Sequence, residues 1–172
     1  ISKCLRHKHD KKLLNSYQSE RYSNVKEYIE TTMRMGEFVN AVESIKITDN
    51  ISFGKDGIES MKSIKPGLGR GLGKQKDNCR GKIFPQFKLK NKKYLDEEFS
   101  TKPILVLSSK FKKKINSKIK SIKSNNVSGL DIYLKNINSK AIIVRPDRFI
   151  LSSLSFLKNI KKFIKENLFL LT

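Results

Sequence analysis

Residues 141–151, Ala-Ile-Ile-Val-Arg-Pro-Asp-Arg-Phe-Ile-Leu, constrain the fold of this chain more than any other stretch. The apolar run 141–144 has the length and the β-branched content of a buried strand. Pro146 fixes its own φ and disfavours helical geometry in the residue before it, so the strand must turn or end there. Asp147 favours a turn, and residues 149–151 resume an extended apolar segment. The sequence therefore predicts two strands joined by a Pro-Asp turn.

An amphipathic helix is predicted after the second strand. Ser152 and Ser153 have side chains suited to capping its first turn. The apolar residues that fall at helical spacing along it are Leu154, Leu157, Ile160, Phe163, Ile164 and Leu168. The chain is thus predicted to close with a strand, a turn, a strand and a helix.

Three segments of the chain share a family likeness. Val-Arg-Pro-Asp-Arg-Phe at 144–149 resembles the closing motif of flavin-dependent aromatic-ring monooxygenases, the group of phenol hydroxylase and 3-(3-hydroxyphenyl)propionate hydroxylase. Leu-Leu-Asn-Ser-Tyr-Gln-Ser-Glu-Arg at 13–21 resembles the motif that follows the flavin domain in that family. Gly-Lys-Ile-Phe-Pro-Gln at 81–86, with Leu95 and Asp96 behind it, resembles the start of the family's C-terminal domain. The three segments occur in the family's order.

The resemblance assigns structural positions rather than catalytic ones. The family's flavin contacts would lie before Ile1, so no residue here is predicted to be catalytic, to bind the cofactor or to ligate a metal. Glu20 with Arg21, and Arg145 with Asp147, are expected to form ion pairs or caps. The positions matched to the family pattern are Tyr17, Glu20, Arg21, Gly36, Gly81, Pro85, Gln86, Asp96, Arg145, Pro146 and Asp147.

By resemblance, the complete enzyme would hold FAD, use NAD(P)H as cosubstrate and insert one oxygen atom of O2 into a small phenolic substrate. This chain would be an inactive C-terminal fragment that covers the flavin domain and contributes to subunit contacts, for example in a homodimer. Two features depart from the family pattern. Ser100 stands where a glycine is usual, and the segment 108–130 is shorter than usual, as if a strand were missing.

The predicted fold class is α/β. Residues 1–43 are interpreted as the helical end of the FAD-binding domain, residues 44–79 as a linker, and residues 80–172 as a thioredoxin-like C-terminal domain without redox cysteines. The predicted order of elements in that domain is strand, strand, helix, helix, strand, strand, helix. A thioredoxin-like sheet with helices packed on it fits this order.

The N-terminal region has a helical pattern from Asp10 to about Val42. A brief break is expected near Tyr22, with Ser23 or Asn24 capping a second helix. The residues that lie close to one stripe of this region are Leu14, Tyr17, Arg21, Val25, Tyr28, Met35 and Val39.

The C-terminal region contains further predicted elements. Residues 85–89 are predicted to form an edge strand, followed by a turn at 90–91. Residues 104–107 form the clearest inner strand, because a continuous apolar run suits burial on both faces. A short helix is predicted at 131–138. Before it, a lysine-rich helix is predicted whose apolar face consists of Phe111, Ile115, Ile119 and Ile122.

Two segments resemble ligand sites but fail on spacing. The glycines of Pro-Gly-Leu-Gly-Arg-Gly-Leu-Gly at 66–73 match neither the dinucleotide fingerprint nor the Walker A motif, which favours a linker. Cys4, His7 and His9 are spaced as C-x-x-H-x-H, but zinc needs four ligands and Cys79 stands alone. Solvated helix residues are the preferred interpretation of that cluster.

The net charge of +21 limits the function classes without deciding among them. Of the 37 basic residues 30 are Lys and 7 are Arg, whereas phosphate and base recognition favours the bidentate guanidinium. Abundant Lys, Asn and Ile with no Trp favour compositional drift in an AT-rich genome over electrostatic function or a membrane-surface role. Nucleic acid is therefore not the preferred partner. A basic RNA- or ribosome-associated binding protein stays open as the alternative function.

Hydropathy and cysteine usage favour a soluble, cytoplasmic protein. The sequence has no run of 18 apolar residues, so no membrane span is predicted. Two cysteines far apart exclude a disulfide framework and a C-x-x-C redox site, and they suit a reducing cytoplasm.

Overall fold

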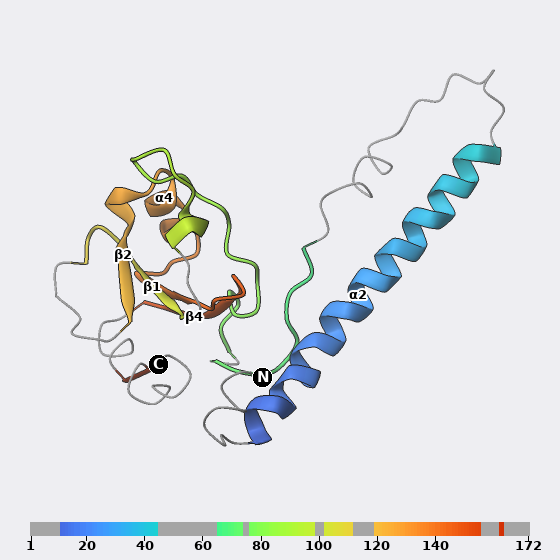
Figure 1. Ribbon diagram of the computed structural model, residues 1–172, viewed down its shortest axis with the longest axis horizontal. Helices are drawn as coiled ribbons and strands as arrows, with labels where there is room; N and C mark the ends of the chain where they lie inside the picture. The colour runs from blue at the N-terminus through green and yellow to red at the C-terminus, as the bar shows by residue number, and fades with distance from the viewer. Residues whose placement is uncertain are drawn as a thin grey trace. The chain divides into compact units, whose positions relative to one another are not determined.

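The computed structural model describes residues 11–44, 65–73, 76–98, 102–111, 119–155 and 162–163 (Figure 1). The chain divides into two compact units, Ile1–Gly71 and Leu72–Thr172. Their boundary falls inside the segment that the sequence assigned to a linker. Secondary structure in the described parts mixes helix and sheet, which agrees with the predicted α/β class. Among the described helices, none is both long and apolar enough to cross a membrane.

The first unit is built on one long helix, α2 (Lys11–Ser44) (Figure 1). Its 34 residues run without interruption, which corresponds to about 51 Å at 1.5 Å per residue. The break predicted near Tyr22 is therefore wrong. Asn24, predicted as a cap, is buried in the middle of α2, where its amide donates to the carbonyl oxygens of Pro66 (2.9 Å) and Gly67 (3.4 Å). The Asn24 side chain is therefore engaged with residues 66–67 instead of capping a helix end, and the backbone hydrogen bonds of α2 continue past it.

The glycine-rich segment 66–71 packs its backbone against α2. The Gly69 N–H donates to the Glu20 carbonyl oxygen at 2.9 Å. A Cβ at Gly69 would lie 2.5 Å from the Ser19 carbonyl oxygen, and a Cβ at Gly71 would lie 2.1 Å from Glu20 Cγ. Both distances are shorter than van der Waals contact allows, so these two positions require glycine. The glycines that resembled a phosphate loop therefore serve helix packing.

The second unit contains a four-stranded mixed sheet in the order β2-β1-β3-β4. The interior strand β1 (Ile104–Leu107) is parallel to β2 (Lys120–Lys123) and antiparallel to β3 (Ala141–Val144). The last strand, β4 (Ile150–Leu154), pairs antiparallel with β3. The predicted inner strand at 104–107 and the predicted hairpin with its Pro-Asp turn are confirmed.

Both faces of the sheet are buried. Every residue of β1 and β3 is at most 3% exposed, which explains why their sequences are continuous apolar runs rather than alternating ones. One face contributes to a cluster that includes Phe84, Leu95, Ile104, Val106, Leu130, Leu134, Ile142, Val144 and Ile150. The other face contributes to a cluster of Leu105, Leu107, Phe111, Ile119, Ala141, Ile143, Leu151, Leu154 and Phe163.

Short helices accompany the sheet. The α-helix α4 (Leu130–Asn136) confirms the short helix predicted at 131–138, and it starts after Gly129, whose φ is 76°. Two 3-10 turns complete the described elements, η1 (Leu95–Glu98) and η2 (Ser124–Asn126). Most of the predicted lysine-rich helix, including Ile115, and of the predicted terminal helix lies outside the described residues. Phe163, within the latter, is helical and buried.

The strand β2 was missed by the sequence analysis. Ile119 and Ile122 were assigned to one face of the lysine-rich helix, but Ile122 lies in β2 and Ile119 lies directly before it. Within β2 only Ile122 is buried, and its three neighbours in the strand are exposed. A four-residue edge strand with one apolar side chain gives no period-2 signal, so the sequence pattern favoured the helix.

The predicted edge strand at 85–89 is wrong as a member of the sheet. This part of the chain makes only isolated bridges, from Ile83 to Phe149, from Lys88 to Tyr94 and from Leu89 to Val127. Its partners change every few residues, and Pro85 has no N–H to donate to a ladder. The turn predicted at 90–91 is present.

The predicted helix cap at Ser152 and Ser153 is also wrong, because both residues and Leu154 belong to β4. The Asp77 carboxylate explains the difference. It accepts hydrogen bonds from Ser152 Oγ (3.3 Å), Ser153 Oγ (2.6 Å) and the Ser153 N–H. Two adjacent serines that suit a helix cap are thus held in extended geometry by a residue 75 positions earlier in the chain.

Candidate functional site

Arg148 joins the two motifs of the second unit. Its guanidinium forms an ion pair with the Asp96 carboxylate, and its Nη2 donates to the Phe84 carbonyl oxygen and to Gln86 Oε1, each at 3.4 Å. The Phe84 N–H donates in return to the Arg148 carbonyl oxygen at 2.8 Å. Burial lowers the pKa of Arg148 from its ordinary value. Segments 62 and 64 positions apart in sequence therefore meet at one side chain.

The backbone around Arg148 extends this junction. The Gly81 N–H donates to the Ile150 carbonyl oxygen at 2.8 Å, and the Ile150 N–H donates to the Lys82 carbonyl oxygen at 2.9 Å. Gly81 is buried with a φ of 76°, a conformation that favours glycine. Pro85 lies between the two residues that contact Arg148 and is half-buried.

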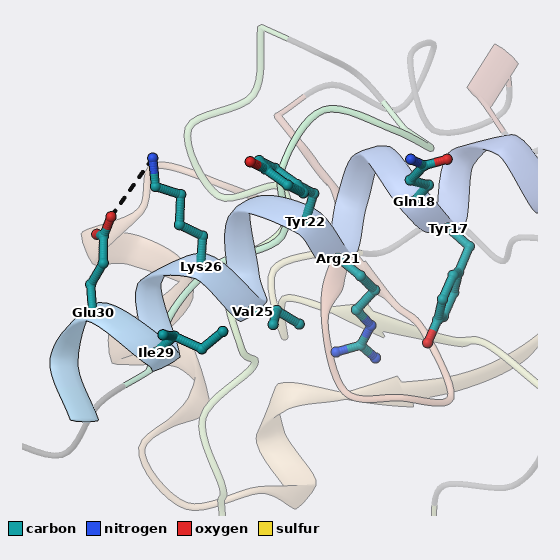
Figure 2. Close-up of a pocket in the computed structure, with 8 residues that line it drawn as sticks. All are labelled: Tyr17, Gln18, Arg21, Tyr22, Val25, Lys26, Ile29 and Glu30. Atoms are coloured by element: carbon teal, nitrogen blue, oxygen red, sulfur yellow. Dashed lines mark ion pairs between the residues drawn. The ribbon is translucent and has the colours of Figure 1, made fainter. Parts of the chain in front are cut away.

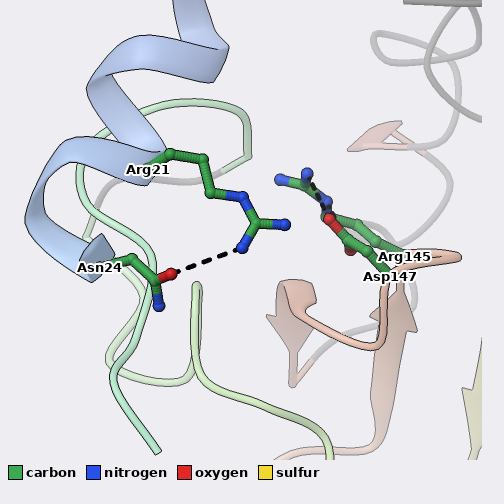
Figure 3. A network of polar contacts seen from close by, with 4 residues as sticks. All are labelled: Arg21, Asn24, Arg145 and Asp147. Atoms are coloured by element: carbon green, nitrogen blue, oxygen red, sulfur yellow. Dashed lines mark hydrogen bonds and ion pairs between the residues drawn. The ribbon is translucent and has the colours of Figure 1, made fainter. Parts of the chain in front are cut away.

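Arg145 and Asp147 pair with each other, one of the two arrangements expected for them (Figure 3). Arg145 Nε donates to Asp147 Oδ1 at 3.1 Å, and its Nη2 donates to Oδ2 at 2.8 Å. This bidentate pair brackets Pro146 and stabilises the turn.

The matched positions in the first unit have different environments. Glu20 is buried on the side of α2 that contacts Gly71, whereas Tyr17 is exposed. Arg21 Nη1 donates to Asn24 Oδ1 at 3.4 Å (Figure 3). A Cβ at Gly36 would meet no described atom within 4 Å.

A cleft of about 630 Å³ opens beyond the carboxyl ends of β1 and β2. This is the edge of open α/β sheets where ligands bind, and the volume falls within the roughly 300–1,000 Å³ of small-molecule sites. Its walls come from the segment after β1, from α4, from the residues before β3 and from Ser155 after β4. The polar residues that line it are Ser108, Ser109, Lys110, Asp131, Lys135, Asn138, Ser139, Lys140 and Ser155.

Asp131 is held by hydrogen bonds at this cleft. Its Oδ1 accepts from the hydroxyls of Ser124 and Ser108 and from the Ser109 N–H, the last two at 3.4 and 3.3 Å. The Ser124 hydroxyl is the main cause that lowers the pKa of Asp131 below its ordinary value, and burial opposes it. A carboxylate with a lowered pKa is a weak base, so it does not activate a serine well. Both histidines of the chain lie outside the described residues.

The described residues match neither a metal cluster nor an FAD pyrophosphate site. Among them, no three His, Cys, Asp or Glu side chains gather closely enough to hold a metal ion. An FAD pyrophosphate needs glycines whose backbone N–H groups face the ligand at a helix start, but Gly69 and Gly71 face α2. The thiol of Cys79 is buried in the core and therefore poorly placed for redox exchange.

Comparison with known proteins finds no match to a family model, a curated protein or a solved structure. The role of each residue must therefore be argued from its own contacts. Sequence reasoning assigned no role to Arg148 or to Asp77, which make the long-range contacts of the second unit. Nothing local distinguishes Arg148 from Arg145, so no sequence signal separates their roles.

Proposed function

We propose that this chain is the C-terminal portion of an FAD-dependent, NAD(P)H-using monooxygenase that hydroxylates a phenolic ring. In this proposal the portion holds no cofactor and performs no chemistry. It supplies the end of the flavin domain, through α2, and a C-terminal α/β domain that stabilises the complete enzyme. FAD and the aromatic substrate would bind to the part that precedes Ile1.

The observation that carries the proposal is the junction at Arg148. Segments 81–86 and 95–96 and the closing segment 144–149 each resemble a motif of one enzyme family. In the fold they share hydrogen bonds, an ion pair and backbone pairing. Unrelated stretches would not be expected to contact one another, so their convergence supports treating them as one structural unit.

The sheet gives further support to a thioredoxin-like assignment. Its first two strands are parallel, and its last two form an antiparallel hairpin that pairs with β1. The order β2-β1-β3-β4, with α4 between β2 and β3, is the arrangement typical of a thioredoxin-like sheet. The segment after β1 reads Ser108, Ser109, Lys110, which suits a domain that has no redox cysteines.

The DNA upstream of the Ile1 codon provides the first test. The proposal expects the same reading frame to encode a glycine-rich βαβ start and a Gly-Asp motif. Protein made from that longer frame should bind FAD, seen as quenching of flavin fluorescence, and the 172-residue chain should not. A start codon close to Ile1 with no such domain would refute the proposal.

The same material tests the nucleic-acid alternative. A protein that binds through its 37 basic side chains should lose affinity steeply as salt rises. The proposal expects weak, non-saturating binding of the chain to RNA at physiological salt. Tight, saturable binding there would favour the alternative function.

A further inference from the structure

Helix α2 exposes a large apolar surface. Nine of its large apolar side chains are between 40% and 69% exposed, and these are Leu14, Tyr17, Tyr22, Val25, Tyr28, Ile29, Met33, Met35 and Val39. At about 100° per residue they fall within an arc of roughly 160°. An apolar surface this continuous marks an interaction site in a folded protein. We call this surface the apolar arc.

The opposite side of α2 is the one that the chain itself covers. Glu20 projects from that side, is 3% exposed, and contacts Gly71. Ser23 projects there as well, with its hydroxyl 2.8 Å from the Cβ position of Gly69. Among the residues that the structure describes, the first unit thus buries a polar side of its helix and leaves the apolar arc exposed, the reverse of an ordinary surface helix.

A groove of about 640 Å³ lies along the apolar arc (Figure 2). Tyr17, Tyr22, Val25 and Ile29 line it, and the Lys26–Glu30 ion pair (3.7 Å) lies beside them. Two tyrosines and two aliphatic side chains on one face suit a predominantly apolar partner surface.

The spacing along the arc indicates what shape that partner has. Positions 14, 18, 21, 25, 28, 32, 35 and 39 follow one another in alternating steps of four and three over more than three heptads. This alternation is the seam of two helices that pack side by side. Five of the eight positions are apolar, namely Leu14, Val25, Tyr28, Met35 and Val39. The seam therefore fits another α-helix.

The charge distribution along α2 indicates which helix would pair with it. Residues 11–26 carry four basic side chains and one acidic, a net +3, and residues 27–44 carry one basic and four acidic, a net −3. The first turn holds no acidic residue and the last turn no basic residue, so these charges oppose the helix dipole. An antiparallel copy of the same helix would place each half beside the half of opposite charge.

We propose that α2 pairs antiparallel with α2 of a second copy of this chain through the apolar arc, with the two-fold axis between Val25 and Tyr28. The axis follows from the charge pattern, because the sign changes between residues 26 and 27. A two-fold contact requires one patch that complements itself, and this helix has matched apolar positions and mirrored charges. The inference is made for the 172-residue chain; under the function proposed above, the flavin domain is the competing partner for the apolar arc.

Sedimentation equilibrium of the 172-residue chain tests the pairing. The unsubstituted chain should form a dimer. The double variant Val25→Glu/Val39→Glu should raise the dissociation constant of the dimer by about a hundredfold or more, because it would bury unpaired charge in the seam. Ala41→Glu is the control for an added glutamate, since it places one negative charge at an exposed position on the opposite side of the helix. All three chains should keep the same helical circular dichroism.

Cross-linking tests the orientation in a Cys4→Ser background, in which the remaining Cys79 is buried. The double variant Val25→Cys/Tyr28→Cys should form a disulfide-linked dimer on mild oxidation, because these two positions face each other across the axis, and Leu14→Cys should not. A Leu14→Cys dimer would mean a parallel pair and would overturn the proposal. So would a monomeric unsubstituted chain, whose apolar arc would then belong to a different protein, or a dimer that survives Val25→Glu/Val39→Glu.

Discussion

The two units of this chain treat apolar surface in opposite ways. The sheet of the second unit buries both of its faces, and every residue of β1 and β3 lies in its core. The helix of the first unit buries Glu20 and Asn24 and exposes nine large apolar side chains. In the second unit, the apolar side chains of β1 and β3 are buried by other residues of the same chain. In the first unit, α2 leaves an exposed apolar surface of the kind that marks interaction sites.

The contrast extends to the polar contacts. In the second unit, Arg148 and Asp77 tie distant segments to the hairpin. In the first unit, the long-range contacts are backbone approaches that glycine makes possible, together with the Asn24 amide. Loss of a side chain should therefore damage the second unit most, whereas a gain of one should damage the first.

Truncation of the core should have the largest effect on stability. Ile143→Ala removes a fully buried side chain from β3 and should lower the free energy of unfolding by about 3 kcal/mol. Ile29→Ala, on the exposed apolar arc, should change it by less than about 0.5 kcal/mol in dilute protein. Denaturant titration of both variants measures the difference. Equal losses would mean that the arc is buried within the chain, against the comparison.

Loss of the Arg148 side chain should have the next largest effect. Arg148→Met removes contacts to Asp96, the Phe84 carbonyl oxygen and Gln86 in distant segments, and it should destabilise the second unit by about 2 kcal/mol. Arg145→Met is the matched control, because it removes an ion pair within a turn and should cost less than about 1 kcal/mol. Thermal unfolding would rank the two, and a larger loss for Arg145→Met would refute the junction.

Adding one methyl group should distinguish the glycines of the first unit. Gly69→Ala places a Cβ 2.5 Å from the Ser19 carbonyl oxygen and should cost about 1–2 kcal/mol. Gly36→Ala has open space in mid-helix and should stabilise α2 by about 0.5–1 kcal/mol. Helical circular dichroism during heating reports both. A neutral Gly69→Ala would show that residues 66–71 do not pack closely on α2.

The smallest expected effect is a pH dependence in the core of the second unit. The pKa of Tyr133 is raised to about 12, mainly because the phenol is partly buried and to a smaller extent because of electrostatic repulsion from Cys79. Since an unfolded tyrosine ionises near 10, the unfolded state loses its proton first, and stability should fall as pH rises from 10 towards 12. Tyr133→Phe should flatten this decline in melting temperature. An identical decline in both chains would contradict a neutral, buried phenol.

The parts of the fold that the sequence predicted are those with local causes. The runs 104–107 and 141–144 are continuous and apolar, and Pro146 with Asp147 marks a turn, so β1, β3 and the hairpin turn could be predicted. Ile122 alone could not predict β2, because an edge strand buries one residue in four. Ser152 and Ser153 favoured a cap, because their true partner Asp77 lies far away in sequence.

The candidate sites depend almost wholly on long-range contacts. The cleft draws residues from four separate segments, and no spacing in the sequence brings Lys110, Asp131 and Ser155 together. Spacing distinguishes the glycines at 66–71 from the phosphate-loop motifs, but only the fold shows what they pack against. The fold likewise brings Arg148 together with Phe84, Gln86 and Asp96, and no sequence pattern predicts these contacts.

Hydrogen–deuterium exchange at several protein concentrations tests the central contrast most directly. We predict that amides of β1 and β3 are strongly protected at every concentration, because their burial is complete within one chain. Amides of α2 from Leu14 to Val39 should gain protection as concentration rises and the apolar arc becomes covered. Protection of α2 that equals that of the sheet in dilute protein and does not change with concentration would contradict this account.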